Sequence, residues 1–384
     1  RRTFAIISHP DAGKTTLTEK LLLYGGAIHL AGSIKSRKTQ RHAVSDWMEI
    51  EKQRGISVTS SVLQFDYAGC RINILDTPGH QDFSEDTYRT LMAVDSAVMV
   101  IDVAKGVEAQ TKKLFKVCKQ RGIPIFTFVN KLDHYGKLPI DIMDEIENVL
   151  GIRSCPMNWP IGQDGQYMGV YDRRNKKVLL FSADTTHGQE ARIADVYEPD
   201  DPAVIERIGE DTWQTLKDDI ELLDEAGEAF DMEKVNSGEL TPMFFGSAMT
   251  NFGVQDFLEG YIRMAPTPQP RLSSDGLIAP DDEKFSGFVF KIQANMNPAH
   301  RDRLAFIRIC SGKFERNMSV WHERSGKIIK LAQPQQFLAQ DRQIIDTAYP
   351  GDIVGLFDPG IFGIGDMICD ESHKFKYADF PVFP

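Results

Sequence analysis

The residues Ser8 to Thr15, with the sequence Ser-His-Pro-Asp-Ala-Gly-Lys-Thr, constrain the fold of this chain more than any other stretch. The apolar run Phe4–Ile7 before them predicts a short strand, and Lys14–Tyr24 after them predicts an amphipathic helix. A strand, a loop ending in Gly-Lys-Thr and a helix are typical of phosphate binding, although Ser8 stands where the usual pattern has Gly. The alternative is a strand, a turn and a helix that share these letters by chance.

Each residue type in this loop has a use beside a polyphosphate. Backbone N–H groups at the start of a helix favour negative charge. Gly13 lets the backbone approach closely, Lys14 supplies a positive charge, and the Thr15 hydroxyl is a ligand type for Mg²⁺. We therefore expect the following residues to bind nucleotide phosphates: Ser8, His9, Pro10, Asp11, Ala12, Gly13, Lys14, Thr15 and Thr16.

Composition limits the class of protein. The 384 residues suffice for two or three domains, and no apolar run approaches the ~20 residues that cross a bilayer. The net charge of −11 argues against coating of bare nucleic acid, but it is compatible with docking on a ribonucleoprotein through local basic patches. The five cysteines are scattered without a Cys-x-x-Cys pair, which argues against disulfides and zinc. We expect a cytoplasmic monomer that has no membrane partner.

The first 130 residues alternate between strand and helix patterns, which predicts an α/β domain with a mostly parallel sheet. In such sheets ligands bind at the carboxyl ends of the strands. Helices are expected at Phe83–Ala93 and Glu108–Gln120. Strands are expected at Thr3–Ser8, Val58–Tyr67, Ile72–Asp76, Ala97–Asp102 and Pro124–Asn130.

The rest of the chain predicts an inserted subdomain and a second domain. Residues 134–242 interrupt the alternation with a hairpin around Asn175 and an acidic helical stretch from Asp201 to Glu228, before a strand returns at Pro242–Gly246. We expect a nucleotide-binding domain over 1–265, a proline-rich linker over 266–283 and an antiparallel β-barrel over 284–374. The barrel strands are expected at Phe285–Gln293, Arg303–Ser311, Met318–His322, Lys327–Leu331 and Ile353–Phe357. The tail 375–384 has the composition of a linker to a further domain.

A second motif, Asp76-Thr77-Pro78-Gly79-His80, follows the strand that ends at Asp76. A carboxylate at a strand end can hold Mg²⁺ through water, and the Gly79 N–H can bind a γ-phosphate. Alone, Asp-x-Pro-Gly also makes a good turn. Its position behind a phosphate-binding loop favours the nucleotide role.

A third motif, Asn130-Lys131-Leu132-Asp133, predicts which base is bound. The Asp133 carboxylate can accept two hydrogen bonds from guanine, where adenine offers no donor. The Lys131 stem can lie along the base, and Asn130 can tie this loop to the phosphate-binding loop. The alternative is a strand-ending Asn with a helix-capping Asp. Ser247 and Ala248 follow the Pro242–Gly246 strand, and the Ala248 N–H is expected to contact the guanine oxygen.

Between the first two motifs lies Arg54–Val58, preceded by a long polar loop. We interpret it as a segment that is ordered by γ-phosphate and Mg²⁺, with the Ser57 hydroxyl as a metal ligand. The alternative is an ordinary exposed loop. The expected metal ligands are thus Thr15, Ser57 and Asp76.

These motifs, in this order, resemble those of the translational GTPases, and the chain is similar along its whole length to the release-factor branch of that family. The stretches that carry the resemblance are Ile7–Thr16, Ser45–Glu49, Glu51–Ser57, Asp76–Arg89 and Gly287–Asn295. Elongation factor G is the main alternative within this family, but it usually has Thr at the position of Ser57 and Ile at that of Pro10.

The resemblance implies a GTPase that acts on the ribosome in translation termination and promotes the departure of codon-reading release factors. It implies GTP, GDP and Mg²⁺ as ligands, and it assigns to His80 the positioning of the attacking water. Asp11 matches a position that in related GTPases helps to hold a monovalent cation, with simple loop capping as the alternative. The family has a C-terminal domain that these residues lack. Two other functions stay open: an elongation-type translocase, and a guanine-nucleotide sensor that also accepts guanosine 3′-diphosphate-5′-diphosphate.

Overall fold

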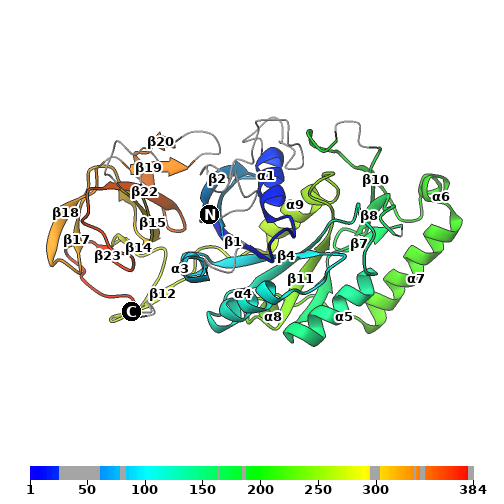
Figure 1. Ribbon diagram of the computed structural model, residues 1–384, viewed down its shortest axis with the longest axis horizontal. Helices are drawn as coiled ribbons and strands as arrows, with labels where there is room; N and C mark the ends of the chain where they lie inside the picture. The colour runs from blue at the N-terminus through cyan, green and yellow to red at the C-terminus, as the bar shows by residue number, and fades with distance from the viewer. Residues whose placement is uncertain are drawn as a thin grey trace.

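The structure is a computed structural model. It describes residues 1–25, 61–77, 84–162, 164–183, 187–294, 303–332, 334–337 and 342–378. Along its longest axis, a β-domain lies at one end, an α/β domain lies in the middle and an inserted subdomain lies at the other end (Figure 1).

A seven-stranded sheet forms the centre of the α/β domain, with the order β2-β3-β1-β4-β5-β11-β6. Six of these strands run parallel to their neighbours, and only β2 is antiparallel, to β3. Ala68 and Gly69 both have positive φ in the two-residue turn that joins them, as a tight hairpin requires. The mostly parallel sheet confirms the predicted fold class. Its strands are β1 (Arg2–Ser8), β2 (Ser61–Tyr67), β3 (Cys70–Asp76), β4 (Ser96–Asp102), β5 (Ile125–Asn130), β6 (Arg153–Pro156) and β11 (Leu240–Phe245).

Helices cover both faces of this sheet, because successive side chains of each buried strand point to opposite faces. In β4, Val98 and Val100 pack in the core with α1 (Lys14–Tyr24) and α9 (Val254–Met264). Ala97 and Met99 pack instead in the core that contains residues of the helices on the other face. These helices are α3 (Ser84–Met92), α4 (Ala109–Gln120) and α5 (Pro139–Leu150).

Helix α1 differs in one respect from its prediction. It is a helix, but every residue from Lys14 to Leu23 is buried, including Glu19 and Lys20. The polar side that an amphipathic helix would turn to water is thus covered. Part of the cover is a segment of the insertion, residues 187–192, which bonds to Lys20 and Tyr24.

Between β6 and β11, the described residues of the insertion form a four-stranded antiparallel sheet and three helices. Its sheet has the order β10-β9-β8-β7, and β8 and β9 form the hairpin expected around Asn175. The acidic helical stretch is divided in two, because Gly209 (φ 85°, ψ 155°) leaves the helical conformation between α6 and α7. The elements are β7 (Asn158–Ile161), β8 (Gly169–Asp172), β9 (Lys177–Leu180), β10 (Asp195–Tyr197), α6 (Pro202–Ile208), α7 (Glu210–Ala226) and α8 (Met232–Asn236).

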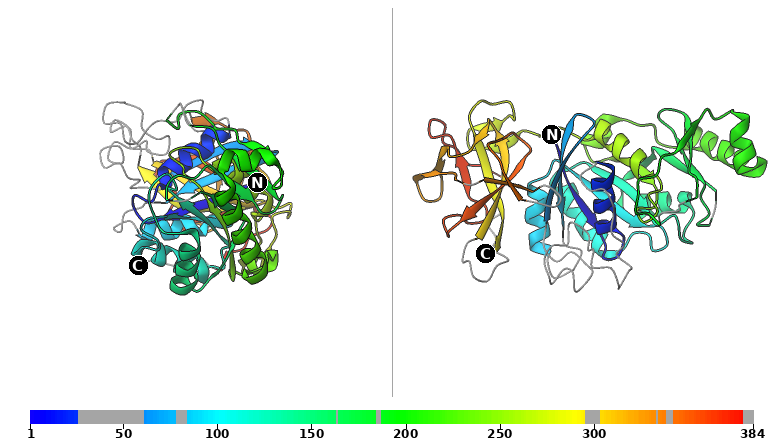
Figure 2. Two further views of the ribbon diagram at one scale, coloured as in Figure 1. Left: turned by 90° about the vertical axis from the view of Figure 1, so that its right-hand side faces the viewer. Right: turned by 90° about the horizontal axis from the view of Figure 1, so that it is seen from above.

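The described part of the β-domain contains a curled antiparallel sheet of eight strands, with the order β18-β17-β23-β14-β15-β22-β19-β20, and two two-stranded sheets, β12-β13 and β16-β21. No helix occurs in its described residues, and Figure 2 shows the strands wrapped around a common centre. Every strand predicted for this domain is present, whereas the following short strands were not predicted: β12, β13, β16, β19, β20, β21 and β23. The elements are β12 (Arg271–Ser273), β13 (Gly276–Ile278), β14 (Ser286–Ala294), β15 (Arg303–Ser311), β16 (Phe314–Glu315), β17 (Ser319–His322), β18 (Lys327–Lys330), β19 (Pro334–Phe337), β20 (Arg342–Ile344), β21 (Thr347–Ala348), β22 (Ile353–Asp358) and β23 (Met367–Cys369).

A cluster of polar side chains surrounds the buried Asp366 carboxylate in this β-domain. The Asp366 carboxylate lies 2.7 Å from His322 Nε2 and accepts hydrogen bonds from Arg324 Nε at 2.7 Å and the Gly363 N–H at 2.8 Å. His322 is fully buried, and its Nδ1 lies 2.7 Å from Ser325 Oγ. The cluster therefore joins the β17–β18 hairpin to the loop before β23.

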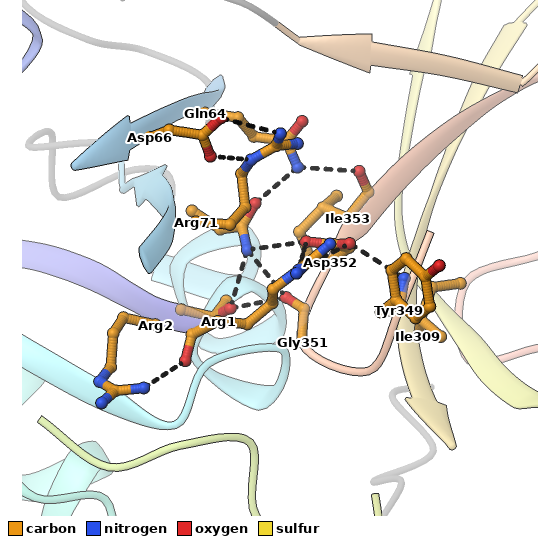
Figure 3. Close-up of polar contacts among 12 residues, drawn as sticks. Arg1, Arg2, Gln64, Asp66, Arg71, Ile309, Tyr349, Gly351, Asp352 and Ile353 are labelled. Atoms are coloured by element: carbon orange, nitrogen blue, oxygen red, sulfur yellow. Dashed lines mark hydrogen bonds and ion pairs between the residues drawn. The ribbon is translucent and has the colours of Figure 1, made fainter. Parts of the chain in front are cut away.

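The two domains meet through buried polar side chains. The loop before β22 presents Gly351 and Asp352 to the amino-terminal half of β1 and to β3 (Figure 3). Thr3 Oγ1 donates to the Gly351 oxygen at 2.6 Å, and Asn73 Nδ2 donates to Asp352 Oδ1 at 3.3 Å. Gln64 Nε2 of β2 reaches the Ile353 oxygen at 3.3 Å. Three neighbouring strands thus contact one loop of the β-domain.

A second contact lies at the end of α3. Arg308 of β15, with 1% of its side chain exposed, forms an ion pair with Asp95 at 3.0 Å. The Arg308 guanidinium also donates to the Ala93 oxygen at 2.5 Å, and Arg271 of the linker donates to the Met92 oxygen at 2.6 Å. Two arginines thus bind the carbonyl oxygens of the last residue of α3 and of the residue that follows it.

Beside this contact, a cavity of about 690 Å³ lies between the linker and the amino ends of β4 and β5. The predicted site residues that the structure describes do not line it and lie at the opposite edge of the sheet. No helix in the described part of the chain is long and apolar enough to cross a membrane.

Candidate functional site

The parts of the sequence motifs that the structure describes lie at the carboxyl ends of β1, β3, β5 and β11, as predicted for a parallel sheet. Ser8 ends β1, Asp76 ends β3 and Asn130 ends β5, and Ser247 follows β11. Ile6 is directly opposite Asp76 in the β1–β3 pair, so these two strand ends lie side by side. The sheet thus brings together loops that are up to 240 residues apart in the chain.

The loop after β1 turns sharply into α1. The Ala12 N–H donates to the His9 oxygen at 3.3 Å, and the Leu17 N–H donates to the Gly13 oxygen at 2.9 Å. Gly13 is the N-cap of α1 with φ 102°, a conformation that L side chains rarely adopt. A Cβ at this position would lie 2.1 Å from Asn130 Nδ2, so Gly13 is required by both its backbone and its neighbour.

The other residues of the loop differ in exposure. Ser8 and Ala12 are buried, His9 and Pro10 are half-buried, and Asp11 is exposed with φ 67°. Lys14, Thr15 and Thr16 are buried in the first turn of α1. His9 Nε2 lies 3.6 Å from Glu108 Oε1, a neighbour that the sequence did not indicate.

Asn130 connects three loops of the site. Its Nδ2 donates to the Ala12 oxygen at 2.9 Å, which is the tie to the phosphate loop that the sequence suggested. Its Oδ1 accepts the Ala248 N–H at 2.8 Å. The Ala248 N–H, which we expected to face guanine, is thus shared with Asn130, and a purine oxygen would have to share it or displace Asn130.

Lys131 has φ 70° and reaches back over the phosphate loop. Its Nζ donates to the Asp11 oxygen at 2.5 Å and forms an ion pair with Asp102 Oδ2 at 2.9 Å. Asp102 is a residue that the motifs missed, although it ends β4 at the same edge of the sheet. Burial raises the pKa of Asp102, but hydrogen bonds from Lys131 and the Ala104 N–H outweigh it, and the pKa lies below its ordinary value. The Asp102 carboxylate therefore remains charged and fixes Lys131.

Asp133 presents a partly buried carboxylate, with 21% of its side chain exposed, beside the loop after β11. Its Oδ1 accepts a hydrogen bond from Ser247 Oγ at 2.6 Å, and its Oδ2 lies 3.3 Å from His134 Nε2. Leu132 is buried, and its N–H donates to the Gly246 oxygen at 3.2 Å. These contacts hold Asp133 beside Ser247 and leave part of its oxygen surface open to a ligand.

The described part of the second motif is short. Thr77 is buried, and its Oγ1 donates to the Ile6 oxygen at 2.6 Å, which holds the chain after β3 against β1. Ser57, Pro78, Gly79 and His80 lie outside the described residues, as does the side chain of Asp76. Their expected roles stay predictions.

Comparison with known proteins follows the same division of the chain. Residues 1–267 match the model of the elongation factor Tu GTP binding domain, and residues 284–371 match that of elongation factor G domain 2. Peptide chain release factor 3 of Symbiobacterium thermophilum is 65% identical over 383 residues, which cover 100% of this chain and 72% of the relative. The protein of the same name from Gloeothece citriformis is 59% identical, and 71% of it is covered.

A solved structure supports the fold alone. A crystal structure from Thermus thermophilus matches 99% of this chain and 56% of its own chain, with a TM-score of 0.75 and 23% sequence identity.

Proposed function

The chain belongs to the family of peptide chain release factor 3, and from this premise we propose that it hydrolyses GTP on the ribosome during translation termination. Its GTP-binding domain is of the elongation factor Tu type. In this role it promotes the dissociation of codon-reading release factors. The main structural support for the proposal is the pair of hydrogen bonds made by Asn130. They join the phosphate loop at Ala12 to the loop after β11 at Ala248. Relatives with the release factor name do not favour a translocase.

The proposed roles follow the position of each group. The loop Ser8–Thr15 surrounds the phosphates, with Lys14 offsetting their charge. Asp133 accepts hydrogen bonds from guanine, while Asn130, Lys131, Leu132, Ser247 and Ala248 hold the loops around the base. Phosphoryl transfer needs positioning and charge neutralisation more than covalent participation by the protein. His80 is proposed to orient the attacking water, with the ribosome completing the site.

Oxygen ligands suit Mg²⁺, and the predicted ligands are of this kind. Thr15 lies in the first turn of α1, and the end of β3 at Asp76 is paired with β1, so two of the three predicted positions lie at one edge of the sheet. When bound, the ion would neutralise charge on the phosphates. Thr15, Ser57 and Asp76 are the residues proposed to hold it.

The test of this function is GTP turnover with and without ribosomes that carry a bound codon-reading release factor. We expect slow turnover by the protein alone and an acceleration on the order of 10³-fold, as for other GTPases completed by a partner. Turnover by the isolated full-length protein at the ribosome-stimulated rate would contradict the proposal.

The GDP site is also proposed to accept guanosine 3′-diphosphate-5′-diphosphate, because the roles proposed above concern the base and the 5′-phosphates, and none is assigned to the 3′ oxygen. Calorimetry with GTP, GDP and this alarmone tests the idea, which fails if the alarmone does not bind. We further propose that the protein acts as a monomer, which light scattering can check.

A further inference from the structure

One segment of the insertion, residues 187–192, packs against the α/β domain. We call it the covering segment. It lies on α1, the helix that starts at the phosphate loop. Lys20 Nζ donates to the Gly188 oxygen. The Tyr24 hydroxyl donates to the Arg192 oxygen at 3.1 Å and accepts the Arg192 N–H at 3.0 Å. The covering segment is thus bonded to α1 at two successive turns.

The same segment is bonded to the loop 247–252 that follows β11. Asn251, which is fully buried and has φ 60°, donates through Nδ2 to the Gly188 oxygen at 3.0 Å and to the Glu190 oxygen at 2.6 Å. Arg192 Nη1 donates to the Thr250 oxygen at 3.1 Å. Helix α1 and loop 247–252 are also bonded directly to each other. Lys20 Nζ donates to the Met249 oxygen and the Tyr24 hydroxyl donates to the Asn251 oxygen, each at 3.3 Å.

The other side of loop 247–252 faces the base-reading residues. Ser247 Oγ bonds to Asp133, and the Ala248 N–H bonds to Asn130. The covering segment therefore contacts the two parts of the proposed site from outside: the helix that begins at the phosphates and the loop that lies beside the base.

We propose that the covering segment is a latch that sets the rate at which guanine nucleotide is released. The proposal rests on the guanine-nucleotide site proposed above. A nucleotide held by its phosphates at α1 and by its base at loop 247–252 leaves only when these parts loosen from each other. Hydrogen bonds that join them from outside oppose this loosening, so their loss raises the dissociation rate constant more than it changes the association rate constant. Displacement of the insertion then becomes a means of accelerating nucleotide exchange.

Gly188 allows the latch to be disturbed by one methyl group. It has φ +76°, and a Cβ there would lie 1.9 Å from the Met249 oxygen, so Gly188→Ala must push the segment away from loop 247–252. Gly209, in the same insertion, has φ +85° and nothing within 4 Å of such a Cβ. Gly209→Ala therefore strains the backbone of the same insertion without the clash and is the control. Tyr24→Phe is a second latch variant, which removes only the hydroxyl that bonds to Arg192 and Asn251.

The experiment loads the full chain with GDP carrying a fluorescent methylanthraniloyl group and chases it with unlabelled GDP in a stopped-flow instrument. We expect dissociation to be about tenfold faster for Gly188→Ala, equivalent to about 1.4 kcal/mol. For Tyr24→Phe we expect a rise of about threefold, the smaller effect of one lost hydroxyl. Gly209→Ala should release GDP at the wild-type rate, and association rate constants should stay within twofold throughout.

Two outcomes overturn the latch. The first is a wild-type GDP dissociation rate constant in both single variants, Tyr24→Phe and Gly188→Ala. If Gly188→Ala does not fold, a wild-type rate constant in Tyr24→Phe is sufficient. The other is an equal rise in Gly188→Ala and Gly209→Ala, which would indicate general destabilisation. Failure of the wild-type chain to bind GDP would contradict the proposed function instead, so the two failures are distinguishable.

Discussion

One carboxylate, that of Asp133, is expected to carry the preference for guanine. Asp133→Asn keeps an oxygen that can accept the Ser247 hydrogen bond, but it replaces the acceptor facing the base by a donor. We expect GDP affinity to fall by roughly 100-fold, the loss of two charge-assisted hydrogen bonds, and xanthosine diphosphate to bind instead. Calorimetry with both nucleotides measures the change. Asp211→Asn, at an exposed helix position, is the control, and unchanged GDP affinity in Asp133→Asn would refute the assignment.

Asp102 is expected to act on the nucleotide only through Lys131. Asp102→Asn retains an acceptor for the Ala104 N–H but loses the charge that fixes Lys131. We expect GDP affinity to fall about tenfold, as for the loss of one charged hydrogen bond. In a chain that carries Lys131→Met, the same change should have little further effect. Additive losses in this double-mutant cycle would mean that Asp102 has an independent role.

Local motifs predict some of these side chains and not others. Asn130 and Asp133 belong to four consecutive residues at the end of a strand, and the tie of Asn130 to the phosphate loop could be predicted from that pattern. Asp102 and Asn251 have no such signature, since each matters through a partner that the fold supplies: Lys131 for Asp102, and the covering segment for Asn251. Ala248 shows a further limit of prediction from sequence: its N–H, expected to face guanine, donates to Asn130 Oδ1.

Among the strands, the β17–β18 hairpin and the loop before β23 depend on Asp366. Burial raises the pKa of Asp366, but hydrogen bonds from Arg324, the Gly363 N–H and His322 outweigh it and leave the pKa below its ordinary value of 3.8. A carboxyl whose pKa is lower in the folded state stabilises the fold fully above its unfolded pKa, and this contribution is lost as the pH falls through the folded pKa.

Asp366→Asn should therefore reduce the free energy of unfolding by about 1–3 kcal/mol at pH 7 and remove this part of the acid sensitivity. Urea unfolding followed by circular dichroism between pH 6 and pH 2 measures both effects. Asp281→Asn, at an exposed position, should behave as wild type. An acid response in Asp366→Asn as steep as in wild type would show that other carboxylates are responsible.

Periodicity predicted the long elements well and the short ones poorly. The buried strands β1, β4 and β5 were found because continuous apolar runs are typical of parallel sheets. The division of the acidic stretch at Gly209 was missed, since one glycine inside a helical pattern is often tolerated. Strands such as β16 and β21 have two residues each, too few for a period, and their pairing depends on the curled sheet around them.

The relation of the two domains depends on a buried ion pair. Removing Arg308 leaves Asp95 buried without its cation and the Ala93 oxygen without a donor. We expect Arg308→Met to lower the free energy of unfolding by about 3–5 kcal/mol, the usual effect of breaking a buried pair on one side. Denaturant unfolding is the measurement. Arg207→Met, which breaks a pair that is exposed on both sides, should lower it by no more than about 1 kcal/mol.

A smaller loss of stability would change which contacts we take to hold the two domains together. A loss for Arg308→Met as small as that for Arg207→Met would mean that water reaches Asp95. In that case the contacts of Thr3, Gln64 and Asn73 with the loop before β22 would be the main connection between the domains.

The enclosure of α1 has a consequence for how the whole protein fluctuates. Amide protons exchange with solvent only when their hydrogen bonds open, and a helix buried on all sides opens rarely except by global unfolding. The amides from Leu17 to Leu23 should thus be among the slowest to exchange deuterium, with or without nucleotide. The helix that starts at the phosphate-binding loop is then a part of the molecule that stays closed while less buried segments open.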